Sequence, residues 1–174
     1  GKNCHIVIYP VNQNKELNLV CIIRDKKYDP DNIKTLVNKV VTQNSNLEKV
    51  FEGDLKSWPL YFTPKILPST NSKVFYIGDA FNGFLPTLAQ GAGQSIESAY
   101  ELFNLIKENK TNIQNTYFQT RLKRAKIVRK RSNFNFFVFH FSSTFMQSIR
   151  NFFIKFLVKR KRFINSYLGT VYKN

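Results

Sequence analysis

Hydrophobic residues form two short continuous runs at the start of the chain and recur at helical spacing further on. Two runs rich in β-branched residues, His5–Val11 and Leu17–Ile23, flank the polar stretch 12–15, and this pattern predicts a β-hairpin. The segment 29–31 predicts the start of a helix, because apolar residues follow it at intervals of three and four. These apolar residues are Ile33, Leu36, Val37 and Val40. A second short helical piece is predicted near 46–51.

The middle of the chain holds a short apolar run followed by an amphipathic helix. Residues 73–77, Lys-Val-Phe-Tyr-Ile, predict a buried strand that ends at Gly78 and Asp79. A helical pattern begins at Gly91 and continues to about Lys107, with an apolar stripe on one face of the helix. The stripe consists of Ile96, Ala99, Tyr100, Phe103 and Ile106.

Two further helices are predicted in the C-terminal part. The first runs from about Asn112 to Arg131, with an apolar side and several basic residues on its other sides. Its apolar side is Ile113, Tyr117, Phe118, Leu122, Ala125 and Val128, and its basic residues are Arg121, Lys123, Arg124, Lys126, Arg129 and Lys130. The second runs from about Ser143 to Lys159. Charged residues interrupt its apolar run, so it is a poor transmembrane candidate.

The positive charge is concentrated in this C-terminal part. The 174 residues include 27 basic and 11 acidic side chains, which give a formal net charge of +16. Residues 107–174 hold 16 of the basic residues and a single acid, Glu108. Such a stretch is typical of a solvated face or of a surface that contacts anions, nucleic acid or membranes. Two Cys and two His exclude a disulfide scaffold and a His-rich metal centre, and the adjacent pair Cys4 and His5 is a poor site, so no metal is expected.

The residues from Gly78 to Gly93 are the strongest candidates for binding chemistry. Asp79, at the end of the predicted strand, can accept hydrogen bonds from vicinal hydroxyls such as those of a ribityl or ribose group. Pro86 stiffens the loop that follows. Gly91, Ala92 and Gly93 are small and open a helix whose free N–H groups favour an anion. The same pattern is also compatible with a strand, loop and helix packed only for stability.

This segment resembles the second FAD-binding motif of the group A flavoprotein aromatic monooxygenases, the salicylate and para-hydroxybenzoate hydroxylase-like family. The resemblance is carried by 77–80, 85–86, 88–92 and 96–99. Weaker matches cover most of the remaining chain. They are Gly1 with His5–Val11, Trp58–Tyr61, the Tyr-x3-Arg-x2-Arg-Ala-x2-Val pattern of 117–128, Phe139 with His140, and Tyr167–Gly169.

The resemblance implies roles for individual residues. Gly78 and Asp79 would bind FAD, with Asp79 on the ribityl chain, and Pro86 would lie beside the isoalloxazine. The backbone N–H groups of Gly91, Ala92 and Gly93 would face the N1–C2=O edge of the flavin, where a helix N-terminus stabilises negative charge. Gln90 would reach the flavin or the substrate.

Two positions depart from the family pattern, and two motifs are absent. Asn82 stands where the family often has His, and Ser98 stands where it often has Asp. The chain has neither the Gly-x-Gly-x-x-Gly fingerprint that would hold the ADP half of FAD nor the family's Asp-Gly segment. The resemblance therefore implies the C-terminal portion of such an enzyme, which lacks the N-terminal half with the fingerprint.

The implied fold class is α/β, with α+β character in this portion. It would comprise the C-terminal part of a Rossmann-like FAD domain, a remainder of a mixed-sheet substrate domain and a helical C-terminal tail. The expected boundaries are 1–62 for the remainder of the substrate-binding domain, 63–131 for the FAD-binding part and 132–174 for the tail.

The implied activity is hydroxylation of an aromatic, phenolic substrate with FAD, NAD(P)H and O2. Reduced FAD would add oxygen and transfer one oxygen atom to the ring, although this chain alone is expected to be inactive. A catalytically inactive relic of the family and a basic nucleic-acid-binding module are the alternatives; the absence of a nucleic-acid motif argues against the second. We expect a cytoplasmic protein, with peripheral contact of the basic tail at the inner membrane face as an open alternative.

Overall fold

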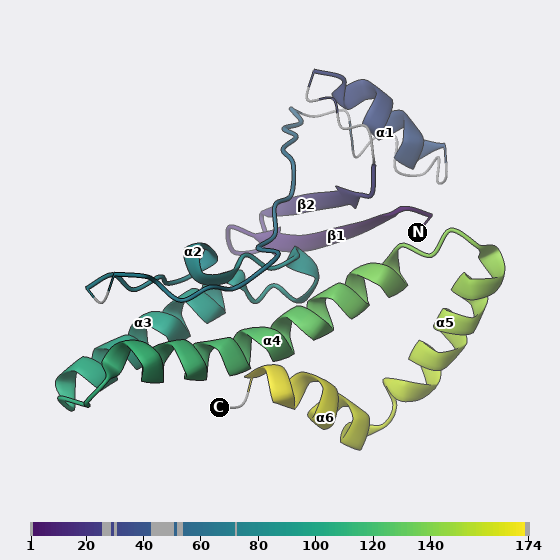
Figure 1. The fold of residues 1–174 in the computed structure, drawn as a ribbon. Coiled ribbons are helices and arrows are strands. Elements are labelled where there is room, and N and C mark those ends of the chain that lie inside the picture. The colour runs from purple at the N-terminus through teal and green to yellow at the C-terminus, as the bar shows by residue number, and fades with distance from the viewer. Residues whose placement is uncertain are drawn as a thin grey trace. The chain divides into compact units, whose positions relative to one another are not determined.

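The structure is a computed structural model that describes residues 2–25, 29, 31–42, 51, 54–71 and 73–172. It contains both helices and an antiparallel pair of strands (Figure 1). The chain divides into two compact units, and each is described by itself. The first comprises 1–59 and 137–156, and the second comprises 60–136 and 157–174.

The first unit is built on the predicted hairpin. Strand β1 (Cys4–Val11) pairs with β2 (Glu16–Ile23) in an antiparallel register that sets Cys4 opposite Ile23 and Val11 opposite Glu16. The turn takes left-handed backbone angles at Asn12, Gln13 and Asn14, where the two Asn residues tolerate this conformation well. The hairpin prediction is confirmed.

Helix α1 (Ile33–Val41) follows the hairpin, as its apolar spacing predicted. The side chain of Asn32 caps it by accepting a hydrogen bond from the backbone N–H of Thr35 at 3.2 Å. Val40 is buried on its inner face. The short helical piece predicted near 46–51 lies almost entirely outside the described residues.

The second unit places two long helices side by side (Figure 1). The short helix α2 (Asp79–Asn82) and the 3-10 turn η2 (Pro86–Leu88) lead into α3 (Gly91–Lys107), whose bounds match the prediction. Helix α4 (Ile113–Phe139) continues eight residues past the predicted end at Arg131. Helix α5 (Thr144–Leu157), which belongs to the first unit up to Phe156, lies within the predicted range. Helix α6 (Lys161–Tyr172), in the second unit, was not predicted as a separate helix.

One expectation for the second unit is wrong. Residues 73–77 form no strand, because the hairpin is the one sheet among the described residues and no strand there pairs with them. The large side chains of the apolar stripe of α3 are exposed. In the described parts of the chain, no helix combines the length and the apolar character that crossing a bilayer requires.

Candidate functional site

Gly78 forms the turn that precedes Asp79, and this turn packs closely against α3. Its φ of +60° and ψ of −138° are readily adopted by glycine and strained for other residues. A β-carbon at this position would lie 2.7 Å from Ser95 Oγ, so the backbone also approaches α3 closely. The carbonyl of Gly78 accepts the backbone N–H groups of Phe81 and Asn82, both at 3.0 Å. Glycine is therefore required here by both conformation and packing, and it sets Asp79 at the exposed start of α2.

The loop that carries Pro86 is fastened to α4 by a buried serine. Ser132 Oγ donates to the carbonyl of Leu85 at 2.5 Å, and Thr87 Oγ1 donates to the carbonyl of Ser132 at 2.8 Å. Asn135 Nδ2 also donates to the carbonyl of Thr87, at 3.4 Å. Pro86 is exposed, while its two neighbours, Leu85 and Thr87, are hydrogen-bonded to α4.

The N-terminus of α3 is open at the positions where small residues were noted. A β-carbon on Gly91 would meet no atom within 4 Å, and one on Gly93 would meet only Gln90 Oε1, at 3.8 Å. No side chain caps the helix within the described residues, and the first three N–H groups of an α-helix have no acceptor inside it. Gly91, Ala92 and Gly93 thus offer three donors beside open space.

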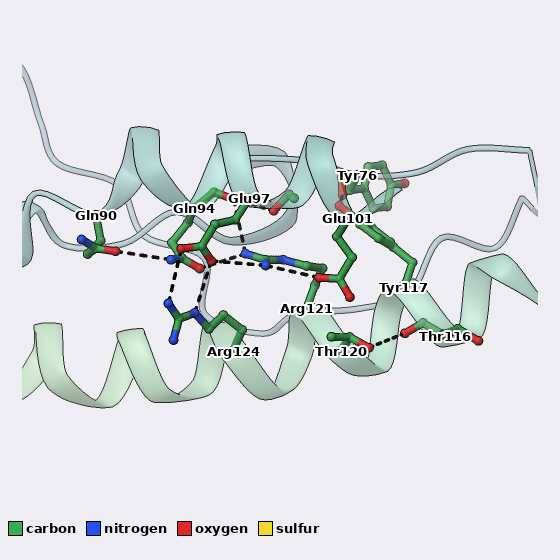
Figure 2. Close-up of polar contacts among 11 residues, drawn as sticks. Tyr76, Gln90, Gln94, Glu97, Glu101, Thr116, Tyr117, Thr120, Arg121 and Arg124 are labelled. Atoms are coloured by element: carbon green, nitrogen blue, oxygen red, sulfur yellow. Dashed lines mark hydrogen bonds and ion pairs between the residues drawn. The ribbon is translucent and has the colours of Figure 1, made fainter. Parts of the chain in front are cut away.

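A chain of side chains behind this opening connects Gln90 to α4 (Figure 2). Gln90 is buried, and its Oε1 accepts a hydrogen bond from Gln94 Nε2 at 3.3 Å. Gln94 Oε1 in turn accepts from Arg121 Nη2 at 2.8 Å. The prediction that Gln90 reaches a flavin or a substrate stays a prediction. In this structure the side chain of Gln90 is hydrogen-bonded to Gln94, in the first turn of α3.

Ion pairs join the same two helices beyond Gln94 (Figure 2). Arg121 is 5% exposed, and its Nη1 lies 3.4 Å from Glu97 Oε2 and 3.5 Å from Glu101 Oε2. Arg124 makes a bidentate contact with Glu97, in which Nε donates to Oε2 at 3.2 Å and Nη2 donates to Oε1 at 3.3 Å. The polar side of α3 therefore packs against α4. We call Gln94, Glu97, Glu101, Arg121 and Arg124 the α3–α4 polar cluster.

Tyr117 anchors the segment before Gly78 to α4. Its hydroxyl donates to the carbonyl of Tyr76 at 2.8 Å, and its ring meets the edges of Phe75 and Phe81 at centroid distances of 5.9 and 6.2 Å. Burial raises the pKa of the Tyr117 hydroxyl, which therefore stays protonated and able to donate.

Asn82 is buried where the resembling family often has His. Arg129 donates through Nη2 to Asn82 Oδ1 and through Nη1 to the carbonyl of Pro64 at 3.2 Å. Burial lowers the pKa of Arg129. Asn82 Nδ2 is buried with no hydrogen-bond partner in the described parts of the chain, so the amide is only half satisfied.

The first unit holds a pair of imidazoles, His5 and His140. His5 Nδ1 and His140 Nε2 lie 3.2 Å apart, and His140 Nε2 is 3.4 Å from the carbonyl of Ile22. Burial and the charge of His140 lower the pKa of His5 to about 4. Among the described residues no group of three or more His, Cys, Asp or Glu could hold a metal ion, so this pair has no further ligand of those types.

In the structure, Gly78 lies on the turn before α2, Asp79 begins α2, Pro86 begins η2 and Gly91 begins α3, all within the second unit. Sequence reasoning had placed Gly78 and Asp79 at the end of a strand instead. It missed Arg121 and Ser132 as buried polar anchors. A signal was present: Tyr117, Arg121, Ala125, Val128 and Ser132 recur at intervals of three and four, and all are buried. Arg121 was assigned to a solvated side because of its residue type.

Curated proteins similar to this chain are flavin enzymes and hydroxylases. An FAD-dependent monooxygenase of Aspergillus candidus is 30% identical over 145 residues, which are 74% of this chain and 33% of that protein. Salicylate hydroxylase of Pseudomonas putida is 27% identical over 125 residues, or 64% of this chain and 28% of that enzyme. The 3-amino-4-hydroxybenzoate 2-monooxygenase of Streptomyces platensis is 23% identical over 167 residues, or 87% of this chain and 41% of that enzyme.

The chain thus spans about a third of the length of these curated relatives. No protein-family model matches it, and no solved structure does. The relatives are monooxygenases or hydroxylases by name, and two of the names include an aromatic acid. The similarity therefore supports a relationship to the FAD-dependent aromatic monooxygenases.

Proposed function

We propose that this chain supplies part of the FAD site of a monooxygenase that hydroxylates an aromatic, phenolic substrate with NAD(P)H and O2. The single observation that carries the proposal is the open N-terminus of α3, which follows an exposed Asp79 on a glycine-dependent turn. The similarity to an FAD-dependent monooxygenase and to salicylate hydroxylase supports it.

The residues fit a flat, partly anionic group such as a flavin. Gly91 has open space where a β-carbon would stand, so a planar ring can approach the backbone. The uncapped N–H groups and the positive end of the helix dipole favour negative charge at the same place. FAD, when bound, would supply the redox chemistry that activates oxygen.

In this proposal, the chain binds and orients the cofactor. Asp79 accepts hydrogen bonds from ribityl hydroxyls, and the turn at Gly78 sets the position of Asp79. Pro86 lies beside the ring system on a loop that Ser132 holds in place. The N–H groups of Gly91 to Gly93 stabilise negative charge on the flavin edge, and the donors keep their orientation because the α3–α4 polar cluster fixes the helix.

The domain assignment is part of the same proposal. Residues 1–62 would come from a substrate-binding domain, 63–131 from the FAD-binding domain and 132–174 from a C-terminal tail. The dinucleotide-binding half would lie outside these residues. A purified chain of these 174 residues should therefore neither hold FAD tightly nor consume NAD(P)H in the presence of a phenol.

The experiment is a titration of FAD into the apo form of the full-length enzyme that the proposal requires, followed by flavin fluorescence. Asp79→Ala removes a charged acceptor worth about 1.5–3 kcal/mol, so FAD should bind roughly 10- to 150-fold more weakly. Gly91→Ala adds a methyl group where the flavin would approach, and it should also weaken binding.

Ala99→Ser is the matched control, because it changes an exposed position further along α3 and should leave FAD affinity unchanged. Unchanged affinity in both Asp79→Ala and Gly91→Ala would remove these residues from the cofactor site.

A further inference from the structure

The side-chain amide of Gln90 has one partnered end and one free end. Gln90 is 9% exposed, and its Oε1 accepts a hydrogen bond from Gln94 Nε2 at 3.3 Å. Its Nε2 makes no hydrogen bond within the described parts of the chain, and it lies on the side of the amide away from Gln94 (Figure 2). Polar groups of side chains buried to this degree normally have partners. The Nε2 of Gln90 is therefore a donor available to a ligand.

This donor lies at the open start of α3. Gln90 immediately precedes Gly91, the first residue of the helix. The Oε1 of Gln90 is also the atom that a β-carbon on Gly93 would meet, at 3.8 Å, so the amide lies beside the first turn. The backbone N–H groups of that turn have no acceptor inside the helix. Gln90 thus adds a side-chain donor to the backbone donors that the proposed function assigns to the flavin edge.

Arg121 determines which end of the Gln90 amide is free. A guanidinium has donors and no acceptor, so the atom of Gln94 that lies 2.8 Å from Arg121 Nη2 has to be the carbonyl oxygen. The Nε2 of Gln94 then faces Gln90 and can bond only to the oxygen of Gln90. The nitrogen of Gln90 is thereby left on the unpartnered side. We call Arg121, Gln94 and Gln90 the amide relay.

The surroundings of Arg121 keep the amide relay in this orientation. Arg121 is 5% exposed, and its Nη1 lies within 3.5 Å of both Glu97 Oε2 and Glu101 Oε2. Its Nη2 also donates to the backbone carbonyl of Gln94 at 3.3 Å. Reversing the amide of Gln94 would set its donors against the buried donors of Arg121, which burial makes costly. The direction of both hydrogen bonds in the relay therefore follows from a cation on α4.

We infer that Arg121 and Gln94 are positioning residues that set Gln90 Nε2 as a hydrogen-bond donor to an acceptor atom of the bound flavin. This inference rests on the proposed function and deepens it by assigning a donor polarity to this side chain of the site. A fixed donor binds the form of a ligand that carries more negative charge more strongly, and for a flavin this is the reduced form. The amide relay therefore favours binding of reduced FAD over oxidised FAD.

A purely structural role of the same contacts makes a different prediction. If Arg121 and Gln94 only hold α3 on α4, breaking the relay weakens the binding of oxidised and reduced FAD alike. The midpoint potential of the bound flavin then stays the same, because it depends on the ratio of the two affinities. A change in that ratio is the signature of the donor polarity.

The test is a redox titration of FAD bound to the full-length enzyme, followed by flavin absorbance without substrate. Gln94→Glu keeps one oxygen for Arg121 and turns a second oxygen toward Gln90, so the Gln90 amide has to reverse and present its own oxygen to the ligand. The ratio of the affinities for reduced and oxidised FAD should fall about tenfold. For a two-electron couple this lowers the midpoint potential by about 30 mV. Gln94→Leu leaves Gln90 without a partner, and its effect should be smaller and of the same sign.

Gln90→Leu supplies the matched background, because it removes the amide and leaves position 94 intact. In that background, Gln94→Glu should change the affinity ratio by less than about twofold. A change as large as in the presence of Gln90 would show that the added charge acts directly, and it would overturn the inference. An unchanged midpoint potential in both Gln94→Glu and Gln94→Leu would overturn it as well.

The titration of FAD into the apo enzyme separates this inference from the proposed function. A full-length protein that binds no FAD contradicts the proposed function and the inference together. A protein whose FAD affinity depends on Asp79 and Gly91, but whose midpoint potential is the same in both Gln94 variants, contradicts the inference alone.

Discussion

Replacing Arg121 by methionine would remove the central donor of the α3–α4 polar cluster. The guanidinium donates to Gln94 Oε1 at 2.8 Å and to the carbonyl of Gln94 at 3.3 Å, and it pairs with Glu97 and Glu101. Methionine occupies a similar volume but donates no hydrogen bond. Glu97 would keep Arg124, whereas Glu101 and Gln94 would lose this donor.

The expected cost follows from the burial of the partners. Removing one member of a buried ion pair costs about 3–5 kcal/mol. The carboxylate side chains of Glu97 and Glu101 are 26% and 25% exposed, so water can rehydrate them and the cost falls at the lower end. We expect Arg121→Met to lower the free energy of unfolding of the second unit by about 3 kcal/mol. That loss corresponds to roughly 100-fold faster hydrogen exchange and to a Tm of the unit lower by roughly 12–24 °C.

The assay is hydrogen exchange read by mass spectrometry on peptides from α3 and α4. Lys123→Met is the matched control: it removes one positive charge from an exposed position of the same helix and should cost less than about 0.5 kcal/mol. Arg121→Lys keeps the charge but loses the fork of donors, so its effect should be intermediate. If Arg121→Met and Lys123→Met change exchange equally, the polar cluster does not hold α3 on α4.

Three further predictions concern other parts of the chain. Gly78→Ala should destabilise the second unit by about 2 kcal/mol, through backbone strain and contact with Ser95, whereas Gly91→Ala should change stability by less than about 0.5 kcal/mol; chemical denaturation compares the two. Because burial and His140 lower the pKa of His5 to about 4, the unfolded state binds more protons between about pH 6.5 and 4. Stability should fall as the pH drops through that window, and a denaturation series should show a flatter profile in His5→Phe. The exposed aromatic and basic residues of α5 predict co-sedimentation with vesicles of anionic lipid and not with neutral ones; negligible binding to both would leave α5 as a solvated helix.

Local sequence signals predicted the elements whose partners are close in the chain. The hairpin follows from two apolar, β-branched runs on either side of the turn at Asn12–Asn14, and its register is completed within 23 residues. Helix α1 follows from its apolar spacing and is capped by Asn32 three residues before Thr35. In each case the residues that interact are close together in the sequence, so the local pattern is enough to predict the element.

The wrong prediction of a strand has a different cause. Residues 73–77 have the composition of a buried strand, but a strand also needs a neighbour, and no neighbour can be deduced from the segment itself. Whether the segment pairs depends on what surrounds it in space. Helix α6 lies within the predicted helical tail but was not predicted as a separate helix.

Periodicity shows which residues share a face of a helix and not what that face contacts. In α3, the spacing correctly grouped Ile96 with Tyr100 on one face. The contact between α3 and α4, however, is made by the opposite, polar face through the buried Arg121, which lies 20 residues after Glu101 in the sequence. Since an ion pair needs close geometry to offset desolvation, the polar cluster fixes how α3 lies on α4 more strictly than apolar contact would. The apolar stripe is thereby held in a defined orientation outside that contact.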